Sequence, residues 1–529
     1  MSPNDGLQPP AVSRTKCLAA IAAHLVIAIN TAGGATYYID AQSGKNDWNG
    51  TTPDRAWRDF SNVNAMTLQP GDKVLLRRGC VWNQLLLIKG QGNAQRRIVI
   101  GAYGEGHLPT IRRDGLFSQL CAIVDTPSFM DIRDLHLSHA GAGLLVKVMH
   151  RACRSVTISG VIGREFNGLY WHKGKKEFNA HGLWQGSYGI YVAVRGKEGR
   201  LEDLTIRECE VFDSACGLAL DGGWSSRKGI NNALIDRCFF RDNVKPDHSS
   251  NSIWLAYCEN TRLTRTVIDR GAHSARMGTT ALFLAVMTDF TMRDCTITRT
   301  PDAKTFDRAG VSFEHSGKQY MIERCTFIDN AGAAIQFLRN PDGESVQDAI
   351  IRKCRFIGNH FTKTPAHPQR GQVLISAWKK NNRPTVTVED NHYVNRKIGE
   401  QATVFFSADL HDAMAGVRLR NNVEHRTQDA LWRALPLNDP PTVDAGEDIE
   451  VVGDTAVLKG VARDSNLPQG NELRMQWSLL AGPSAVRIKS PQAPETQVRL
   501  PTIGVYLLHL RADDGGLFRS DVVCVVRRK

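Results

Sequence analysis

Two carboxylates in the middle of the chain have the residue types and the spacing for acid–base chemistry. Asp307 and Glu314 lie seven positions apart, just before and within the apolar segment GVSFEH. Glycoside hydrolysis uses such a pair, with one carboxyl as general acid and the other as base or nucleophile. The sequence therefore predicts Glu314 and Asp307 as catalytic residues for hydrolysis of a glycan.

Basic side chains near the same segments permit a second reaction. In β-elimination from a uronic acid polymer, a Lys, Arg or His removes the proton beside the carboxylate, and basic groups or Ca²⁺ neutralise that carboxylate. The candidates for this chemistry are His273, Arg276, Lys304 and Arg308. The residues leave hydrolysis and elimination open, and Ca²⁺ enters as a cofactor only with elimination.

The elements that must position these residues recur along the chain. Six residues return at intervals of 28 to 30, each within the same pattern of charged pair, small residue and apolar alternation: Cys209, Cys238, Thr266, Cys295, Cys325 and Cys354. No helix-length apolar period lies between them. The period predicts a solenoid whose coils stack with their strands in parallel, because one coil cannot bury its own apolar face.

A second set of segments shares this phase and separates an inner from an outer face. These segments include GIYVAV at 189, SIWLAY at 252, ALFLAV at 281 and GVSFEH at 310. Alternate side chains of a strand face opposite ways, so their aliphatic and Phe positions face the core. Flat rings beside small alanines then lie outside, where they suit a sugar chain, unless a long loop packs over them. We expect substrate binding by Tyr191, Asp221, Trp254, Phe283, Asp247, His248 and His315.

Stacking also limits which carboxylates can cooperate. Asp221 and Glu314 lie three coils apart, about 14 Å at the usual strand spacing. Glycosidases hold their carboxylates within roughly 5 to 9.5 Å. A partner for Glu314 must therefore come from its own or an adjacent coil, and residues 300–310 supply Asp302, Lys304, Asp307 and Arg308.

The N-terminal part of the chain carries a family resemblance. A strand at Tyr38–Asp40, an Asn/Asp/Gly turn region, a short helical stretch near Trp57–Met66 and the segments GDKVLLRRG and IVIGAYGEGHLPTI follow one another. With the coils, this opening resembles the secreted right-handed parallel β-helix proteins, the superfamily of pectate lyases and many polysaccharide-degrading enzymes. The resemblance implies a right-handed β-helix and a carbohydrate-active enzyme. No catalytic motif of those families is present, so no site residue is carried over.

The C-terminal part has a different organisation. Asn-Asp-Pro-Pro at 438–441 is typical of a linker, and short alternating strands follow at the spacing of a small β-sandwich. The segments PPTVDAGEDIEV, WSLLAGP and GVYLLHLRADDGG resemble PKD-like, immunoglobulin-type modules, with Trp477 in the core. The expected fold is all-β, with a signal peptide at 1–35, a β-helix with N-terminal cap at 36–430, a linker at 431–441 and a sandwich at 442–529.

Composition and the N-terminus bear on location and partners. Arg14 and Lys16 precede an apolar run that is typical of an export signal and too short to span a bilayer, with a plain buried segment as the alternative. We expect a protein that is secreted, periplasmic or on the cell surface. The net charge of +12 favours an anionic partner such as an acidic polysaccharide. Its dispersion along the chain argues against nucleic acid, and no other apolar stretch approaches membrane length.

Two classes of function fit these observations. The first is an exported enzyme, a glycoside hydrolase or polysaccharide lyase, that cleaves a polysaccharide in a groove on the outer face of the solenoid. The second is a non-catalytic surface or adhesion protein that binds a glycan or a protein partner. Convergence of Asp307, Glu314, His248, His273 and Arg276 on one concave site would favour catalysis.

Overall fold

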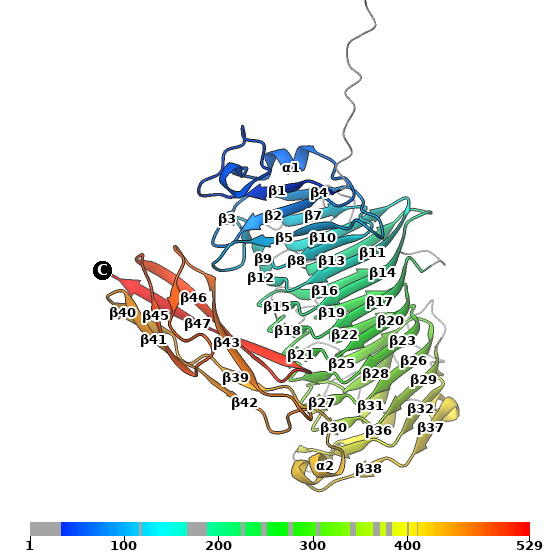
Figure 1. The fold of residues 1–529 in the computed structure, drawn as a ribbon. Coiled ribbons are helices and arrows are strands. Elements are labelled where there is room, and N and C mark those ends of the chain that lie inside the picture. The colour runs from blue at the N-terminus through cyan, green and yellow to red at the C-terminus, as the bar shows by residue number, and fades with distance from the viewer. Residues whose placement is uncertain are drawn as a thin grey trace, which may run out of the picture.

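The computed structural model describes residues 33–115, 119–166, 188–223, 228–244, 251–272, 279–302, 307–338, 345–362, 371–376, 383–398, 401–409 and 411–529. In these residues, the chain up to Glu424 winds through three long parallel sheets, and a small sandwich lies beside the resulting β-helix (Figure 1). Each coil contributes one strand to each sheet. The stacked coils predicted from the sequence are confirmed.

The first sheet of the β-helix has 13 described strands and begins the fold. Consecutive members pair in parallel in the order of the chain. They are β1 (Thr36–Ile39), β2 (Lys73–Arg77), β5 (Ile98–Tyr103), β8 (Met130–Arg133), β11 (Ala152–Ser159), β14 (Arg200–Arg207), β17 (Ile230–Asp236), β20 (Cys258–Thr264), β23 (Thr288–Arg293), β26 (Gly317–Glu323), β29 (Val346–Arg352), β32 (Val386–Glu389) and β37 (Val417–Arg420).

The second sheet has 11 described strands and carries the outer face on which the predicted groove lies. They are β4 (Leu86–Lys89), β7 (Leu120–Asp125), β10 (Ala142–Met149), β13 (Tyr188–Arg195), β16 (Cys216–Asp221), β19 (Ile253–Ala256), β22 (Thr279–Ala285), β25 (Asp307–Glu314), β28 (Ile335–Leu338), β31 (Gly371–Ile375) and β36 (Val404–Ala408).

The third sheet has 12 described, mostly short strands. They are β3 (Val81–Trp82), β6 (Thr110–Arg112), β9 (His136–Ala140), β12 (Ile162–Phe166), β15 (Glu210–Phe212), β18 (Phe239–Arg241), β21 (Val267–Asp269), β24 (Thr296–Thr298), β27 (Thr326–Ile328), β30 (Arg355–Ile357), β33 (His392–Val394) and β38 (Val423–Glu424).

The cysteines stand in file at the turn between the 13-stranded and the 12-stranded sheets. In each coil, the residue that follows the ladder position donates its backbone N–H to the carbonyl of the ladder residue one coil earlier. Phe239 donates to Cys209 (2.9 Å) and Arg355 donates to Cys325 (2.9 Å) in this way. The five ladder cysteines are buried, and the described cysteines are free thiols. They fill the core as small apolar side chains, as the spacing predicts.

The inward positions of the 11-stranded sheet build the core. Ile190, Leu218, Leu282 and Phe313 are among the fully buried residues of one continuous hydrophobic cluster that runs from the first coil to the last. Phe313 stacks on Phe337 of the next coil, with ring centroids 4.8 Å apart. The predicted division of these strands into an inner and an outer face is therefore confirmed.

The N-terminal end carries the short elements that the sequence indicates. The 3-10 helix η1 (Pro53–Arg55) and the helix α1 (Ser61–Ala65) follow β1, and Trp57 and Phe60 close the first coil from their buried positions. At the other end lie the hairpin β34 (Lys397–Ile398) and β35 (Gln401–Ala402), the 3-10 helix η2 (His411–Gly416) and the helix α2 (Gln428–Ala434). Of the predicted signal peptide at 1–35, residues 1–32 lie outside the described residues.

The C-terminal unit is a sandwich of short sheets around Trp477. Its strands are β39 (Thr442–Asp444), β40 (Ile449–Val452), β41 (Thr455–Lys459), β42 (Val461–Arg463), β43 (Arg474–Ala481), β44 (Arg487–Ile488), β45 (Glu495–Arg499), β46 (Gly504–Asp513) and β47 (Phe518–Arg528). Trp477 is buried and donates its indole N–H to the carbonyl of Ala493 (3.2 Å). The position of this tryptophan in the core is as predicted.

The sandwich docks on the 12-stranded sheet through buried polar contacts. Glu210 of β15 accepts a hydrogen bond from Nε2 of His509 (3.0 Å) and one from the hydroxyl of Ser520. Burial alone would raise the pKa of Glu210, but His509 and then Arg241 and Ser520 lower it to about 2. Because a buried carboxylate is stable only with such partners, this contact fixes the relative position of the two units.

A second set of contacts flanks the first. Arg237 donates to both carboxylate oxygens of Asp513 (3.0 and 2.8 Å), and Phe239 meets Phe518 edge to face with centroids 6.1 Å apart.

In the described residues, no helix is long and apolar enough to cross a membrane.

Candidate active site

Strand β25 begins with an irregular turn that redirects Asp307. Asp307 (φ 69°) and Arg308 (φ 55°) are both left-handed, and the pairing register with β22 shifts at Thr279/Thr280, so β25 carries one extra residue. This is a β-bulge, which bends a strand and changes the direction of a side chain. Gly332 makes the turn possible, since a Cβ there would lie 2.0 Å from the carbonyl oxygen of Asp307.

The bulge brings Asp307 to the polar side chains that surround Glu314. Gln336, on the next coil and in register with Ser312, donates its amide to Oδ1 of Asp307 (2.8 Å). The Ser312 hydroxyl donates to Oε1 of Glu314 (3.4 Å). Ser312 and Gln336 are neighbours on adjacent strands, and the charge of Asp307 acts on Glu314, so the two carboxylates lie near each other on the same outer face. Alternation along the strands places Ser312 and Gln336 at outward positions, but the sequence did not predict a role for either residue in the site.

The environment of Glu314 favours its protonated form. Burial, followed by the negative charge of Asp307, raises the pKa of Glu314 to about 8, against a smaller opposing effect of the Ser312 hydrogen bond. Its neighbours in the same outward row are the apolar Ala285 and Leu338. A carboxyl beside an ionised partner in such surroundings can hold a proton at neutral pH and donate it.

Two aromatic rings extend the site along the helix axis. Trp254, Phe283 and Ser312 occupy one outward row on consecutive coils. The rings of Trp254 and Phe283 stack with centroids 5.9 Å apart and an interplanar angle of 20°. Both side chains are partly exposed. They therefore offer a partly exposed apolar surface on the outer face that also carries the carboxylates.

The structure corrects the prediction for Tyr191 and Asp221. Tyr191 is 5% exposed and packs against Tyr188 in a second hydrophobic cluster on the outer face. The partly buried Trp254 packs against this cluster. Asp221 is 1% exposed, accepts hydrogen bonds from the Tyr191 hydroxyl (3.1 Å) and the Gly223 N–H (3.1 Å), and pairs with Arg195. These residues support the outer face from below and do not form its open surface.

The remaining predicted residues are placed in three ways. Arg308 is 2% exposed and pairs with Asp302, so its guanidinium is buried and the prediction that it meets substrate is wrong for this structure. His315 follows Glu314 in the turn, left-handed and half-buried. His273, Arg276, Lys304, Asp247 and His248 lie outside the described residues. No group of three or more His, Cys, Asp and Glu suited to a metal occurs in the part of the chain that the structure describes.

Comparison with known proteins agrees with this architecture. A family model described as a right handed beta helix region matches residues 167–342, and a PKD-domain model matches residues 445–526. The chain is a right-handed β-helix followed by a PKD domain.

Proteins similar to this chain include enzymes that act on carbohydrates. The lacto-N-biosidase of Bifidobacterium longum subsp. longum is 39% identical over 95 residues, which is 17% of this chain; the chain spans only 6% of that relative's length. The GH136 lacto-N-biosidase from Eubacterium ramulus has a TM-score of 0.55 at 15% identity over 74% of this chain and 68% of its own. An alginate lyase from Paenibacillus sp. is 14% identical, with a TM-score of 0.39 over 55% of this chain and 90% of its own. At these identities the likeness to the solved structures shows the fold alone.

Proposed function

We propose that the protein is an exported glycoside hydrolase that cleaves a glycan in the groove over Trp254, Phe283 and Glu314. The observation that carries the proposal is the Asp307–Glu314 pair, in which one carboxyl has its pKa raised to about 8 by burial and by the charge of the other. A carboxyl that holds its proton beside a second, charged carboxyl is the arrangement that hydrolysis of a glycosidic bond requires.

The two residues take different roles in this proposal. Glu314, protonated at neutral pH, donates its proton to the glycosidic oxygen as the sugar leaves. Asp307, oriented by the amide of Gln336, acts as the carboxylate that activates water or attacks the anomeric carbon. The hydrogen bond from the amide holds Asp307 in place, and the negative charge of Asp307 favours the protonated form of Glu314.

The aromatic pair supports a saccharide substrate. Trp254 lies two coils and Phe283 one coil from Ser312, and partly exposed aromatic rings pack on the C–H side of a pyranose. The lacto-N-biosidase relative is consistent with hydrolysis of a glycan. Export is part of the proposal because of the charged and apolar pattern of the first 35 residues.

Elimination by a lyase is the weaker alternative among the described residues. Of its four candidate bases, Arg308 is buried and ion-paired with Asp302, and the other three lie outside the described residues. A non-catalytic glycan-binding protein would use the aromatic pair but would gain nothing from a half-buried, protonated Glu314.

The experiment is an activity screen with matched variants. The purified protein is incubated with neutral and acidic polysaccharides and with lacto-N-biosides, and reducing ends and ultraviolet absorbance are followed. We expect new reducing ends without the absorbance of unsaturated uronates. Glu314→Gln and Asp307→Asn should each lower kcat by about a hundredfold or more. Glu198→Gln, at an exposed turn, is the matched control and should leave kcat unchanged.

Two outcomes would refute the proposal. A rise in absorbance that survives Glu314→Gln would assign elimination. Release of no sugar from any substrate, with binding retained, would assign a glycan-binding protein.

A further inference from the structure

A cleft of about 700 Å³ lies at the N-terminal end of the β-helix, away from the carboxylate pair. Its walls come from residues 67–70, 89–91, 125–126, 147 and 149–151. Strand β4 and the turns after β7 and β10 therefore contribute, together with the segment that follows α1. Backbone pairing fixes one wall. Leu68 forms an isolated β-bridge with Gly90, and the N–H of Leu68 donates to the carbonyl of Lys89 (2.8 Å).

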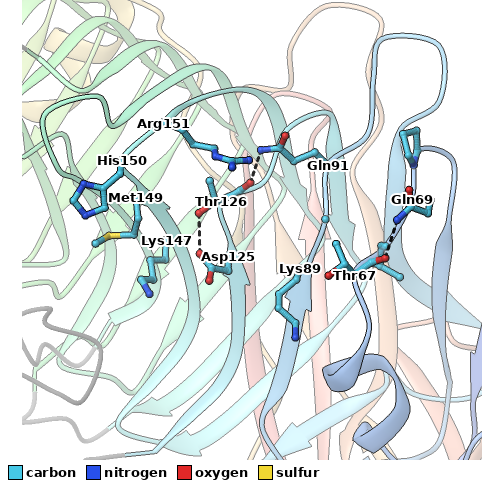
Figure 2. Close-up of a pocket in the computed structure, with 13 residues that line it drawn as sticks. Thr67, Gln69, Lys89, Gln91, Asp125, Thr126, Lys147, Met149, His150 and Arg151 are labelled. Carbon is cyan, nitrogen blue, oxygen red and sulfur yellow. Dashed lines mark hydrogen bonds between the residues drawn. The ribbon is translucent and has the colours of Figure 1, made fainter. Parts of the chain in front are cut away.

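The floor of the cleft is a row of alternating charges. Lys89, Asp125 and Lys147 are in register on three consecutive strands, so their Cα atoms follow one another at about 4.8 Å. Figure 2 shows the three side chains extending to the same side of the sheet. In the described part of the chain, no ion pair joins either lysine to Asp125, whose Oδ1 accepts the Thr126 hydroxyl (2.8 Å).

The rim adds further positive charge and hydrogen-bond donors. Arg151 and His150 are exposed at the edge of the cleft, and Figure 2 shows Arg151 extending toward Gln91. Gln91 is held by its amide, which donates to the carbonyl of Thr126 (3.0 Å). The cleft thus contains three permanent cations and a single carboxylate.

We propose that this cleft binds an acidic oligosaccharide through the carboxylate or sulfate groups on its sugars. Two half-buried lysines, whose Cα atoms lie about 10 Å apart, attract anionic substituents. The carboxylate between them accepts hydrogen bonds from sugar hydroxyls. A polyanion without hydroxyls at that position, such as a nucleic acid, would be repelled by Asp125.

The position of the cleft matches a ligand that extends along the helix axis. The row through Lys147 continues over Ala193, Asp221, Ala256 and Ala285 to Glu314, five coils or about 24 Å farther along the same outer face. The cleft is a separate binding site, and its existence does not depend on catalysis by Asp307 and Glu314.

The test measures binding to the full chain that carries Glu314→Gln, so that ligands stay intact. The probes are an oligogalacturonate, a sulfated heparin oligosaccharide, a neutral maltooligosaccharide and a single-stranded oligonucleotide. Comparison of the first two separates carboxylate from sulfate recognition. The double variant Lys89→Gln/Lys147→Gln should weaken binding of the acidic glycan by about fivefold per lysine, about 25-fold together. The matched control is Lys459→Gln/Lys489→Gln, at exposed positions of the PKD domain.

Asp125→Ala separates the two classes of anion. It should weaken binding of the acidic glycan, because the hydroxyl acceptor is lost, and it should strengthen binding of the oligonucleotide. Equal affinity of the lysine double variant and its control for the acidic glycan would overturn the proposal. So would equal binding of the neutral and acidic glycans, or an oligonucleotide that binds more tightly than either. Retained activity of Lys89→Gln/Lys147→Gln on a short neutral substrate would show that catalysis and this site are independent.

Discussion

Replacing Glu314 by Gln should make the protein more stable at alkaline pH and leave its stability unchanged in acid. Gln has the shape of a protonated glutamic acid and carries no charge at any pH. In the folded protein the pKa of Glu314 is about 8, whereas an ordinary Glu has a value of 4.5. The folded state therefore binds the proton more tightly than the unfolded chain, and its stability falls as pH rises between these two values.

The magnitude follows from the difference between the two pKa values. At about 1.4 kcal/mol for each pKa unit, the interval from 4.5 to about 8 corresponds to a destabilisation of about 5 kcal/mol in the wild type above pH 8. Glu314 keeps partial contact with solvent, which reduces the effect, so we expect about 2 to 3 kcal/mol. The destabilisation is absent below pH 4.5, where Glu314 is protonated in both states.

Denaturant unfolding at several pH values between 4 and 9, followed by circular dichroism, measures this difference. The control is Glu198→Gln, since water solvates the carboxylate of the exposed Glu198 in both the folded and the unfolded states. The gap between Glu314→Gln and wild type should open between pH 4.5 and 8, and the gap for the control should stay constant. A constant gap for both variants would mean that Glu314 ionises normally, and the general acid assigned here would be lost.

Four further predictions follow from single contacts. Trp254→Ala and Phe283→Ala should each raise KM for an oligosaccharide by about fivefold, with little change in kcat. The reason is that contact with an aromatic ring contributes about 1 kcal/mol to binding of the sugar beyond the area buried. An unchanged KM would mean that substrate lies elsewhere. Gly332→Ala should lower kcat while the protein stays folded by circular dichroism, since its Cβ would displace the Asp307 carbonyl; full activity would show that the bulge is dispensable. Glu210→Ala should destabilise the docked PKD domain by about 3 kcal/mol, because His509 loses its buried partner, and should speed proteolysis at 438–441. For the same reason the wild-type docking should hold above pH 4.5 and weaken as pH falls toward 2.

The repeat made most of the fold predictable. A fixed period assigns every coil once one coil is assigned, so Cys209, Cys295 and Cys354 were enough to place the ladder and the inner face. The same arithmetic excluded Asp221 as a partner of Glu314. The structure indeed separates them by three coils, through Ala256 and Ala285.

The outer face was less predictable for a physical reason. Alternation shows that a side chain such as Tyr191 points outward, but it does not show what packs over it. The direction of Asp307 depends on two left-handed residues and on space at Gly332, one coil away in the stack. The charged row through Lys89 and Lys147 precedes the regular ladder, so the periodicity did not bring its members together.

The architecture explains how a destabilising site can persist. Glu314 is confined between Ala285 and Leu338 on neighbouring coils, and hydrogen bonds on both sides of β25 hold its backbone in place. In a stacked fold, the cost of a local irregularity is shared with the coils above and below, whose core remains continuous. The PKD domain adds buried contacts, and these involve the 12-stranded sheet and the turn before it, not the outer face that carries Glu314. The docking contacts and the proposed chemistry thus lie on different faces, so a raised pKa at Glu314 can coexist with a rigid scaffold.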